Sequence, residues 1–312
     1  MWQLISGVYL GWALGANDAS NVFGTAVASR MLRFRTAAIL ASLFIFLGAL
    51  LEGGAGMHTY ADLSRTTLNT AFIVSLMSAL TVTLMTYRQL PVSTSQAVVG
   101  ALIAVGLFNG RVDFSILVKV IICWFGTPIG AMIAAVVLYL LVGQLFNFAD
   151  LNLFQYDRTL RYGLIVAGSY GAFALGANNV ANVTGAFVGE GMLPVTSACI
   201  IGGLSIALGV ISFSRGVMLT VGRGLVRLDA FSAFIVILAE GITVHFYAVV
   251  GVPVSTSQAV VGGVLGIGIV KGVKTVNRRV LSNILVAWLT TPLISLVSTY
   301  LICLVAYRLG LL

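Results

Sequence analysis

Apolar stretches of about 20 residues recur along this chain from one end to the other, and they constrain its fold more than any other feature. Of the 312 residues, 59% are hydrophobic and 8% are charged, whereas a soluble domain carries about 25% charged residues. About 20 apolar residues are what an α-helix needs to cross a bilayer, and membrane β-barrels instead show short alternating segments. The sequence therefore predicts an all-α polytopic membrane protein.

The formal net charge of +8 does not indicate a nucleic-acid partner, because the basic residues lie in short loops between apolar runs. This distribution is the one that orients membrane helices. The sequence contains neither HExxH nor GxxxxGK[ST], and no nucleophile–base pair is visible, so we expect no enzyme and no bound cofactor. The cysteines and histidines stand alone in apolar stretches, and we expect them to pack: Cys123, Cys199, Cys303, His58 and His245.

Four sequence blocks occur twice, in the same order and 161 to 164 residues apart. Their positions in the two halves are 11–21 and 172–182, 71–74 and 233–236, 91–100 and 253–262, and 124–128 and 288–292. We infer two homologous repeats, at 1–148 and 161–312, which are joined by a polar linker at 149–160.

Each half is predicted to form five helical elements. In order, these are 1–29, 37–57, 67–90, 92–109 and 113–147, and then 161–187, 195–213, 230–250, 254–270 and 279–311. We expect the first element to break at the GAND motif of residues 15–18. The fifth element is too long for one crossing, since 35 residues would span about 50 Å against a hydrocarbon core of about 30 Å. We therefore expect a break or re-entrant turn at Gly126–Pro128.

The loop charges predict that the two repeats are inserted upside down relative to each other. After the first element, the first half carries three arginines and the second half carries Glu190. After the second and fourth elements the bias reverses, because Arg65 and Arg111 of the first half have neighbouring aspartates. The basic residues that set this bias are Arg30, Arg33 and Arg35, and in the second half Arg215, Arg223, Arg227, Lys271, Lys274, Arg278 and Arg279.

By the positive-inside rule, the linker then lies in the cytoplasm and both termini lie outside the cell membrane. Each repeat has five elements, and an odd number of crossings makes the second repeat start on the opposite side of the membrane from the first. Inverted repeats are typical of secondary transporters, in which substrate binds near the midplane at broken helices. Channels can also be built from inverted halves, so the topology leaves both classes open.

The decapeptide PVSTSQAVVG, present in both halves, is predicted to begin a helix whose N-terminus binds an anion. Pro91 cannot continue the preceding helix, and Ser93 with Gln96 fits the S-x-x-Q capping box. The free N–H groups and the positive dipole end of such a terminus attract anions. A plain cap needs one or two polar residues, so we interpret the copies as facing halves of one oxyanion site. The candidate ligands are Ser93, Thr94, Ser95, Gln96, Ser255, Thr256, Ser257 and Gln258.

The second polar constellation is GAND with Asn21 in the first half and GANN with Asn182 in the second half. We expect Asn17 and Asn178 to contact the anion. A carboxylate at membrane depth is costly and indicates function, so Asp18 is a candidate ligand for a small cation. The complete set of candidate sodium ligands is Asp18, Asn21, Asn179, Asn182 and Glu240.

The two acidic residues elsewhere in apolar segments do not follow the repeat. Glu240 lies in the middle of a segment, where it can serve as a cation ligand or as a proton acceptor. Glu52 lies near a membrane face, and we expect an interfacial or structural role for it.

GANDASN, GANNVAN and the duplicated PVSTSQAVVG resemble the paired signatures of the PiT family of inorganic phosphate transporters, and the resemblance covers nearly the whole chain. It implies symport of inorganic phosphate with sodium, or in some members with protons, through an inverted-repeat fold. It also implies that the GAND and PVSTSQ segments form the substrate and cation sites. The chain departs from the family pattern at Asn179, where the second signature usually has Asp.

We therefore expect a cation-coupled symporter whose partners are inorganic phosphate, sodium ions and the lipid bilayer. The apolar faces permit a homodimer without requiring one. Three alternatives stay open: proton coupling, a sulfate permease on the same scaffold, and a passive anion channel.

Overall fold

A computed structural model describes residues 2–87, 92–188, 192–224, 228–272 and 278–312. Every regular element in these ranges is a helix, which confirms the predicted all-α fold. The helices are α1 (Leu4–Ala28), α2 (Phe34–Glu52), α3 (Gly54–Leu63), α4 (Leu68–Tyr87), α5 (Thr94–Phe108), α6 (Phe114–Phe148), α7 (Leu153–Thr184), the 3-10 helix η1 (Gly185–Phe187), α8 (Val195–Gly224), α9 (Ala230–Val250), α10 (Thr256–Lys271) and α11 (Arg278–Arg308). Some sequence predictions fall outside the described ranges, namely those on residues 88–90, Pro91, Glu190, Arg227 and Lys274.

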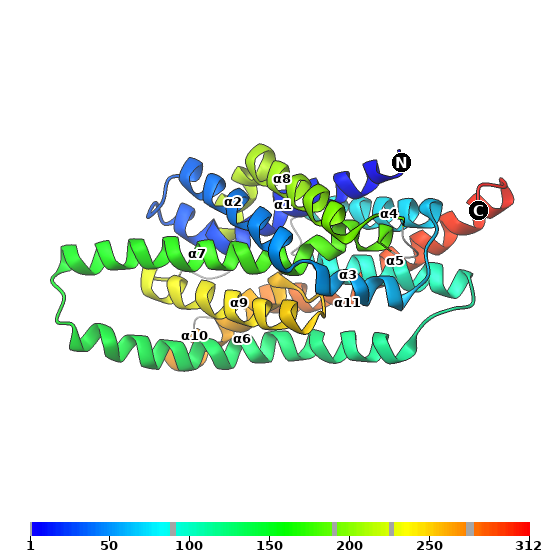
Figure 1. Cartoon of the computed structure of the whole chain (residues 1–312). Helices are drawn as coiled ribbons and strands as arrows, with labels where there is room; N and C mark the ends of the chain where they lie inside the picture. The colour runs from blue at the N-terminus through cyan, green and yellow to red at the C-terminus, as the bar shows by residue number, and fades with distance from the viewer. Residues whose placement is uncertain (1, 88–91, 189–191, 225–227, 273–277) are drawn as a thin grey trace.

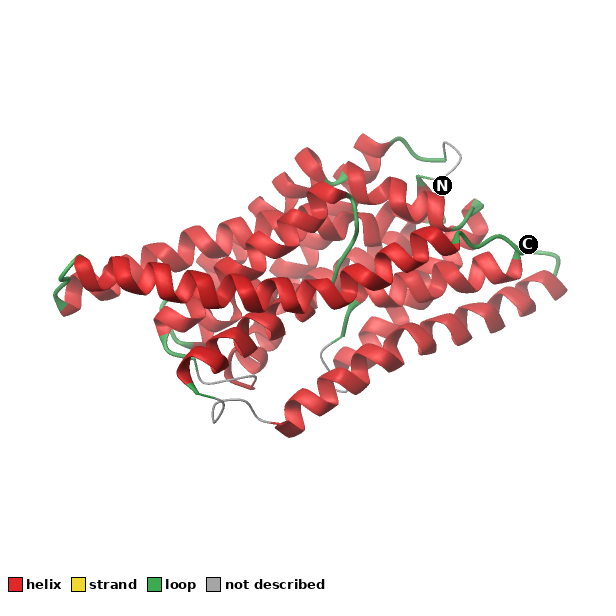
Figure 2. Ribbon diagram, turned by 90° about the horizontal axis from the view of Figure 1, so that it is seen from below, coloured by secondary structure: helices red, strands yellow, loops and turns green. Residues whose placement is uncertain are grey.

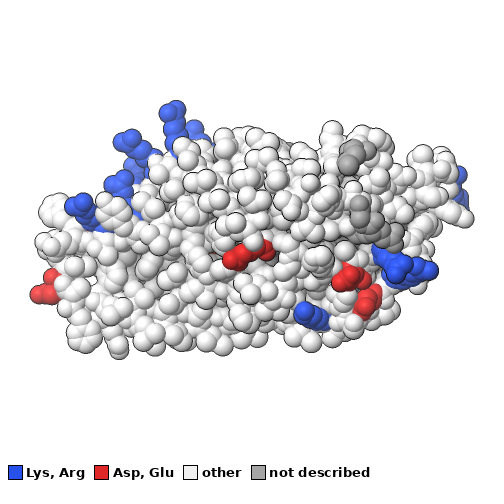
Figure 3. Space-filling model, viewed as in Figure 1, with Lys and Arg blue, Asp and Glu red and all other residues white. Residues whose placement is uncertain are grey.

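Seven helices in these ranges are long and apolar enough to cross a membrane: α2, α4, α6, α7, α8, α9 and α11. The helices run side by side along the molecule, with both chain ends at one end and the α6–α7 turn at the other (Figures 1 and 2). We call these the terminal end and the linker end. Charged side chains gather mainly at the two ends of the face drawn in Figure 3. This distribution suits a bundle whose middle lies in lipid.

The predicted break at the GAND motif is wrong, because α1 continues as a helix through residues 15–18. Asn and Asp disfavour a helix interior by bonding to their own backbone. Here their side chains instead bond to other helices: Asn17 to Thr86 of α4, and Asp18 to Asn179 of α7. The local propensity is therefore overridden by tertiary contacts.

The predicted break at Gly126–Pro128 is also wrong. Pro128 lies inside α6, and the equivalent Pro292 lies inside α11. Pro128 and Pro292 lack the N–H that would bond the carbonyl four residues earlier, that of Trp124 and of Trp288, and membrane helices tolerate this loss. The threonine before each proline bonds a different carbonyl: Thr127 donates to Cys123 and Thr291 donates to Ala287, both at 2.6 Å.

The region predicted as a linker is mostly helical, because α7 begins at Leu153. A capping box starts it, in which Asn152 accepts the backbone N–H of Gln155 and the Gln155 side chain accepts that of Asn152. The turn between α6 and α7 is thus shorter than predicted. The division into repeats at 148 and 161 stays a prediction.

Equivalent glycines of the two halves make equivalent close contacts. A Cβ built on Gly100 of α5 would lie 2.3 Å from the carbonyl oxygen of Pro292, and one on Gly262 of α10 would lie 2.1 Å from that of Pro128. Only glycine lets the helix backbones approach this closely. The pairs α5–α11 and α10–α6 are exchanged by the repeat, as expected for a duplicated chain. Inverted insertion of the halves in the membrane stays a prediction.

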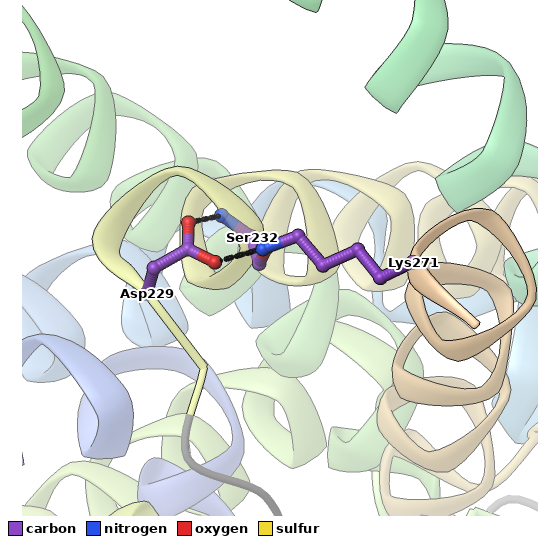
Figure 4. A network of polar contacts seen from close by, with 3 residues as sticks. All are labelled: Asp229, Ser232 and Lys271. Carbon is purple, nitrogen blue, oxygen red and sulfur yellow. Dashed lines mark hydrogen bonds and ion pairs between the residues drawn. The ribbon is translucent and has the colours of Figure 1, made fainter. Parts of the chain in front are cut away.

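One polar network ties the start of α9 to the end of α10 (Figure 4). Asp229 caps α9 by accepting the backbone N–H of Ser232 at 3.0 Å and its hydroxyl at 2.8 Å, and it pairs with Lys271. Partial burial acts to raise the pKa of the Asp229 carboxyl, but Lys271 and Ser232 outweigh it and hold that pKa below its ordinary value.

We expect Gly262→Ala to lower the unfolding free energy by about 1–3 kcal/mol, because the new methyl group overlaps the α6 backbone. Thermal unfolding in detergent measures this. Gly216→Ala in α8 is the matched control, since a Cβ there meets nothing within 4 Å. Equal melting temperatures for the two variants would contradict the tight α10–α6 contact.

Because its folded-state pKa is lowered, Asp229 should stabilise the protein at neutral pH and lose this effect as the pH falls through that pKa. We expect Asp229→Asn to destabilise by up to about 1 kcal/mol at pH 7, as for partly exposed ion pairs. The difference from the parent protein should start to shrink near the ordinary aspartate pKa of about 3.9 and vanish only below the lowered folded-state pKa. The exposed Asp150, changed to Asn, controls for charge; a difference that persists in acid would refute this account.

Candidate functional site

The two PVSTSQ copies lie against each other inside the bundle. The Ser95 hydroxyl donates to the carbonyl oxygen of Val254 at 2.8 Å, and the Ser257 hydroxyl donates to that of Val92 at 3.2 Å. Ser95 corresponds to Ser257 in the repeat, and Val92 corresponds to Val254. Each copy thus bonds to the other in the same way, and the starts of α5 and α10 come together as the sequence predicts.

The starts of α5 and α10 are capped and buried. Ser93 accepts the backbone N–H of Gln96, and Ser255 accepts that of Gln258, both at 3.3 Å. The side-chain oxygens of the two glutamines have no partner in the described structure, so the reciprocal half of each predicted capping box is not formed. All eight candidate anion ligands of the two runs are at most 7% exposed: Ser93, Thr94, Ser95, Gln96, Ser255, Thr256, Ser257 and Gln258.

The asparagines predicted to contact the anion behave differently in the two halves. Asn178 holds the backbone of Val254 with two bonds, donating to its carbonyl oxygen at 2.8 Å and accepting its N–H at 2.9 Å. The equivalent Asn17 donates to the hydroxyl of Thr86 in α4 at 2.7 Å. The second PVSTSQ copy is therefore anchored to α7, whereas Asn17 holds α4.

A chain of hydrogen bonds made by side-chain amides links the two GAND-type motifs. Asn182 donates to the Asn179 carbonyl oxygen at 2.8 Å and to the Ser95 hydroxyl at 3.1 Å. Asn179 donates to Asp18 Oδ2 at 3.3 Å, and Thr256 donates to the same oxygen at 3.4 Å. The other oxygen of Asp18 is buried and has no partner in the described ranges. The chain thus ends on a carboxylate that still has a free acceptor.

Asn21 and Glu240 complete the set of candidate cation ligands. Asn21 donates toward the hydroxyls of Thr256 and Ser257, at 3.2 and 3.4 Å. Glu240 of α9 is fully buried, and neither of its oxygens has a partner in the described structure. Its carboxylate interacts electrostatically with that of Asp18. Two neighbouring buried carboxylates therefore offer free oxygens, which are the ligands that a hard cation accepts.

Sequence reasoning missed Tyr60 and Thr86, which both bond to site residues. Tyr60 of α3 is fully buried, and its hydroxyl donates to Asn182 at 2.5 Å. The repeat could not point to it, because the corresponding positions 221 and 222 are valine and glycine. Thr86 lay in a serine- and threonine-containing helix without a motif.

His245 stands alone in the sequence but has partners in the structure. Its Nε2 lies 2.6 Å from Glu52 Oε2, and its Nδ1 lies 2.8 Å from the Tyr170 hydroxyl. These residues join the end of α2 to α9 and α7. The contacts agree with the structural role expected for Glu52, and they correct the picture of an isolated histidine.

A family model described as "Phosphate transporter family" matches residues 14–299. "Putative phosphate permease MJ0630" of Methanocaldococcus jannaschii is 34% identical over 300 residues, which cover 96% of this chain and 95% of the relative. "Sulfate permease CysP" of Bacillus subtilis is 27% identical over 307 residues, which cover 96% of this chain and 86% of the relative.

A solved structure described as "The sodium-dependent phosphate transporter" superimposes with a TM-score of 0.86 at 23% identity, covering 99% of this chain and 100% of the other. At this identity the match shows a shared fold. The matched family confirms the resemblance that the duplicated motifs carry, and it is a family of transporters and not of enzymes.

We expect Asn178→Ala to destabilise the protein more than Asn17→Ala. The first change removes both bonds to the buried Val254 backbone and should cost about 2–3 kcal/mol, whereas the second removes one bond to a hydroxyl and should cost about 1 kcal/mol. Chemical or thermal unfolding of the two purified variants in one detergent gives the comparison. Equal losses would contradict the asymmetric anchoring of the two PVSTSQ copies.

Proposed function

The chain belongs to the phosphate transporter family. We propose that it is a secondary active transporter, which couples the uptake of inorganic phosphate to the movement of sodium ions in the same direction. One observation carries the proposal. The starts of α5 and α10 meet inside the bundle, where eight neutral polar residues are buried. Asp18, one of whose carboxylate oxygens has no partner among the described residues, bonds to one of the eight.

The anion would be held by helix N-termini and neutral donors. The first N–H groups of a helix lack intrahelical partners, and the dipole favours negative charge there. Neither PVSTSQ copy nor either GAND-type motif contains Lys or Arg. The negative charge of phosphate therefore needs another source of balance, which a co-transported cation supplies.

The cation would bind at Asp18 with amide oxygens of the GAND-type motifs and with Glu240 nearby. Without a cation, the Asp18 carboxylate repels an anion at the adjacent helix starts. Binding of the cation removes this repulsion and raises phosphate affinity, and by linkage phosphate raises cation affinity by the same factor. This reciprocal effect is the physical basis of symport. Since Asn179 replaces a second carboxylate, Asp18 carries the only charge of the two motifs.

The free acceptors favour phosphate over sulfate. Phosphate at neutral pH carries at least one O–H group, whereas sulfate carries none. The side-chain oxygens of Gln96 and Gln258, which have no partner in the part of the chain that the structure describes, can accept that hydrogen. A site that leaves acceptors unpaired disfavours the ligand that lacks the matching donor.

The proposed orientation follows from the loop charges. The α1–α2 loop, with its arginines, lies at the linker end with the α6–α7 turn (Figure 1). By the positive-inside rule this end faces the cytoplasm of a cell membrane, and both termini face outside.

We expect purified protein in liposomes to accumulate labelled phosphate when a sodium gradient is imposed, and we expect Asp18→Asn to abolish the accumulation because it removes the charge that binds the cation. Gradients of sodium and of protons are applied separately. Asp150→Asn, in the exposed α6–α7 turn, should keep full uptake.

Each alternative has a distinct outcome in this assay. Uptake that follows only the proton gradient would show that the coupling ion is the proton and not sodium. Displacement of labelled phosphate by excess sulfate would favour a sulfate permease. Downhill flux that ignores both gradients and survives Asp18→Asn would indicate a passive channel.

A further inference from the structure

The two repeats differ in one large element. With the offset of 161 residues, α2 and α3 together (residues 34–63) correspond to α8 alone (residues 195–224). The first half breaks this helix at Gly53, whereas the second half keeps it continuous. A duplicated chain therefore uses one segment in two conformations.

The break at Gly53 is built by close packing against α7. A Cβ on Gly53 would lie 2.2 Å from Val180 Cγ1 and 2.4 Å from the carbonyl oxygen of Ala49, so the bend requires glycine. The preceding residue, Glu52, is held by His245. The end of α2 is thus fixed to α9, and this contact fixes the position at which α3 begins.

Beyond this bend, α3 lies directly over the candidate site. Tyr60 donates to Asn182, and the Thr59 hydroxyl donates to the carbonyl oxygen of Gly251, just before the second PVSTSQ copy. A Cβ on Gly56 would lie 3.1 Å from Ala181 Cβ and 3.3 Å from Pro253 Cγ. Figure 1 shows α3 in the half of the molecule toward the terminal end. The helix therefore covers the site from that side.

We propose that α3 is the gate of the site on the side of the terminal end, and that Tyr60 is the positioning residue that couples this gate to the site. The role of the gate in transport rests on the proposed function. Tyr60 binds the oxygen of the Asn182 amide, which leaves the amide nitrogen directed to Ser95 and Asn179. Asn179 in turn bonds to Asp18. Closing α3 thus orders the anion and cation ligands together.

The unequal halves fit a site that opens to one side at a time. Alternating access requires that the two ends of an inverted repeat take different conformations in any one state. Here α3, which follows the break at Gly53, covers the site, whereas its counterpart at the end of α8 continues the same helix. Opening of α3 must break the Tyr60–Asn182 and Thr59–Gly251 bonds.

The test measures access to the site with a single cysteine. Cys123, Cys199 and Cys303 are replaced by alanine, and Ser95→Cys is added next to Asn182. A membrane-impermeant thiol reagent is applied to right-side-out and inside-out vesicles, and protease cleavage of a C-terminal tag identifies the terminal side. We expect Tyr60→Phe to raise the labelling rate from the terminal side about fivefold, the factor that corresponds to one hydrogen bond of ~1 kcal/mol.

Two further variants make the result specific. Thr59→Val removes the bond from α3 to the carbonyl oxygen of Gly251 and should raise the same rate. Tyr9→Phe removes a hydroxyl that bonds Thr83 at 2.9 Å between α1 and α4, and it should leave the rate unchanged. Should Tyr60→Phe fail to elute as a folded protein, Thr59→Val carries the same test.

Unchanged labelling rates in both α3 variants, or a rate that rises only from the linker side, would overturn the proposal that α3 is the gate. The reagent reports access in the absence of phosphate and sodium. A failure of phosphate uptake in liposomes would therefore refute the proposed function without deciding the labelling result, and the two proposals can fail separately.

Discussion

Two helices that begin inside the bundle impose the main constraint on this structure. The start of a helix leaves backbone N–H groups without partners, and an apolar surrounding makes each unpaired group costly. The capping serines meet part of this requirement, since Ser93 accepts the N–H of Gln96 and Ser255 accepts that of Gln258. Bonds between the repeats then hold the two starts together: the Ser95 hydroxyl donates to the Val254 carbonyl oxygen, and the Ser257 hydroxyl donates to that of Val92. Everything that holds α5 and α10 in place, including the tight glycine contacts with α11 and α6, keeps these two starts together.

Much of this arrangement could be predicted from the sequence, because it follows from repetition and from the chemistry of helix starts. The duplicated decapeptide predicted that α5 and α10 begin within the apolar region and meet. Predictions that relied on local propensity were wrong at the GAND motif and at Pro128. At the GAND motif, bonds to other helices hold the Asn and Asp side chains that otherwise interrupt a helix, and at Pro128 the helix continues without the proline N–H. The contacts of the GAND motif join residues far apart in the chain, and no local pattern reveals them.

Tyr60 and the pairing of Glu52 with His245 escaped sequence reasoning for the same physical reason. Tyr60 lies in a segment that takes different conformations in the two halves, so comparison of the halves could not detect it. The pairing of Glu52 with His245 likewise joins positions that do not correspond in the repeat. A duplication predicts what the halves share. It cannot predict what each half has acquired separately, and Tyr60 and the Glu52–His245 pair are two such differences.

The length of α6 has a consequence for the surrounding lipid. Its 35 residues extend over about 52 Å, well beyond a hydrocarbon core of about 30 Å. Such a helix accommodates the mismatch by tilting and by extending past the acyl chains. Since Gly262 of α10 is seated on the backbone of Pro128, a change in the tilt of α6 moves the second decapeptide with it. Bilayer thickness is thereby mechanically connected to the geometry of the helix start that α10 presents.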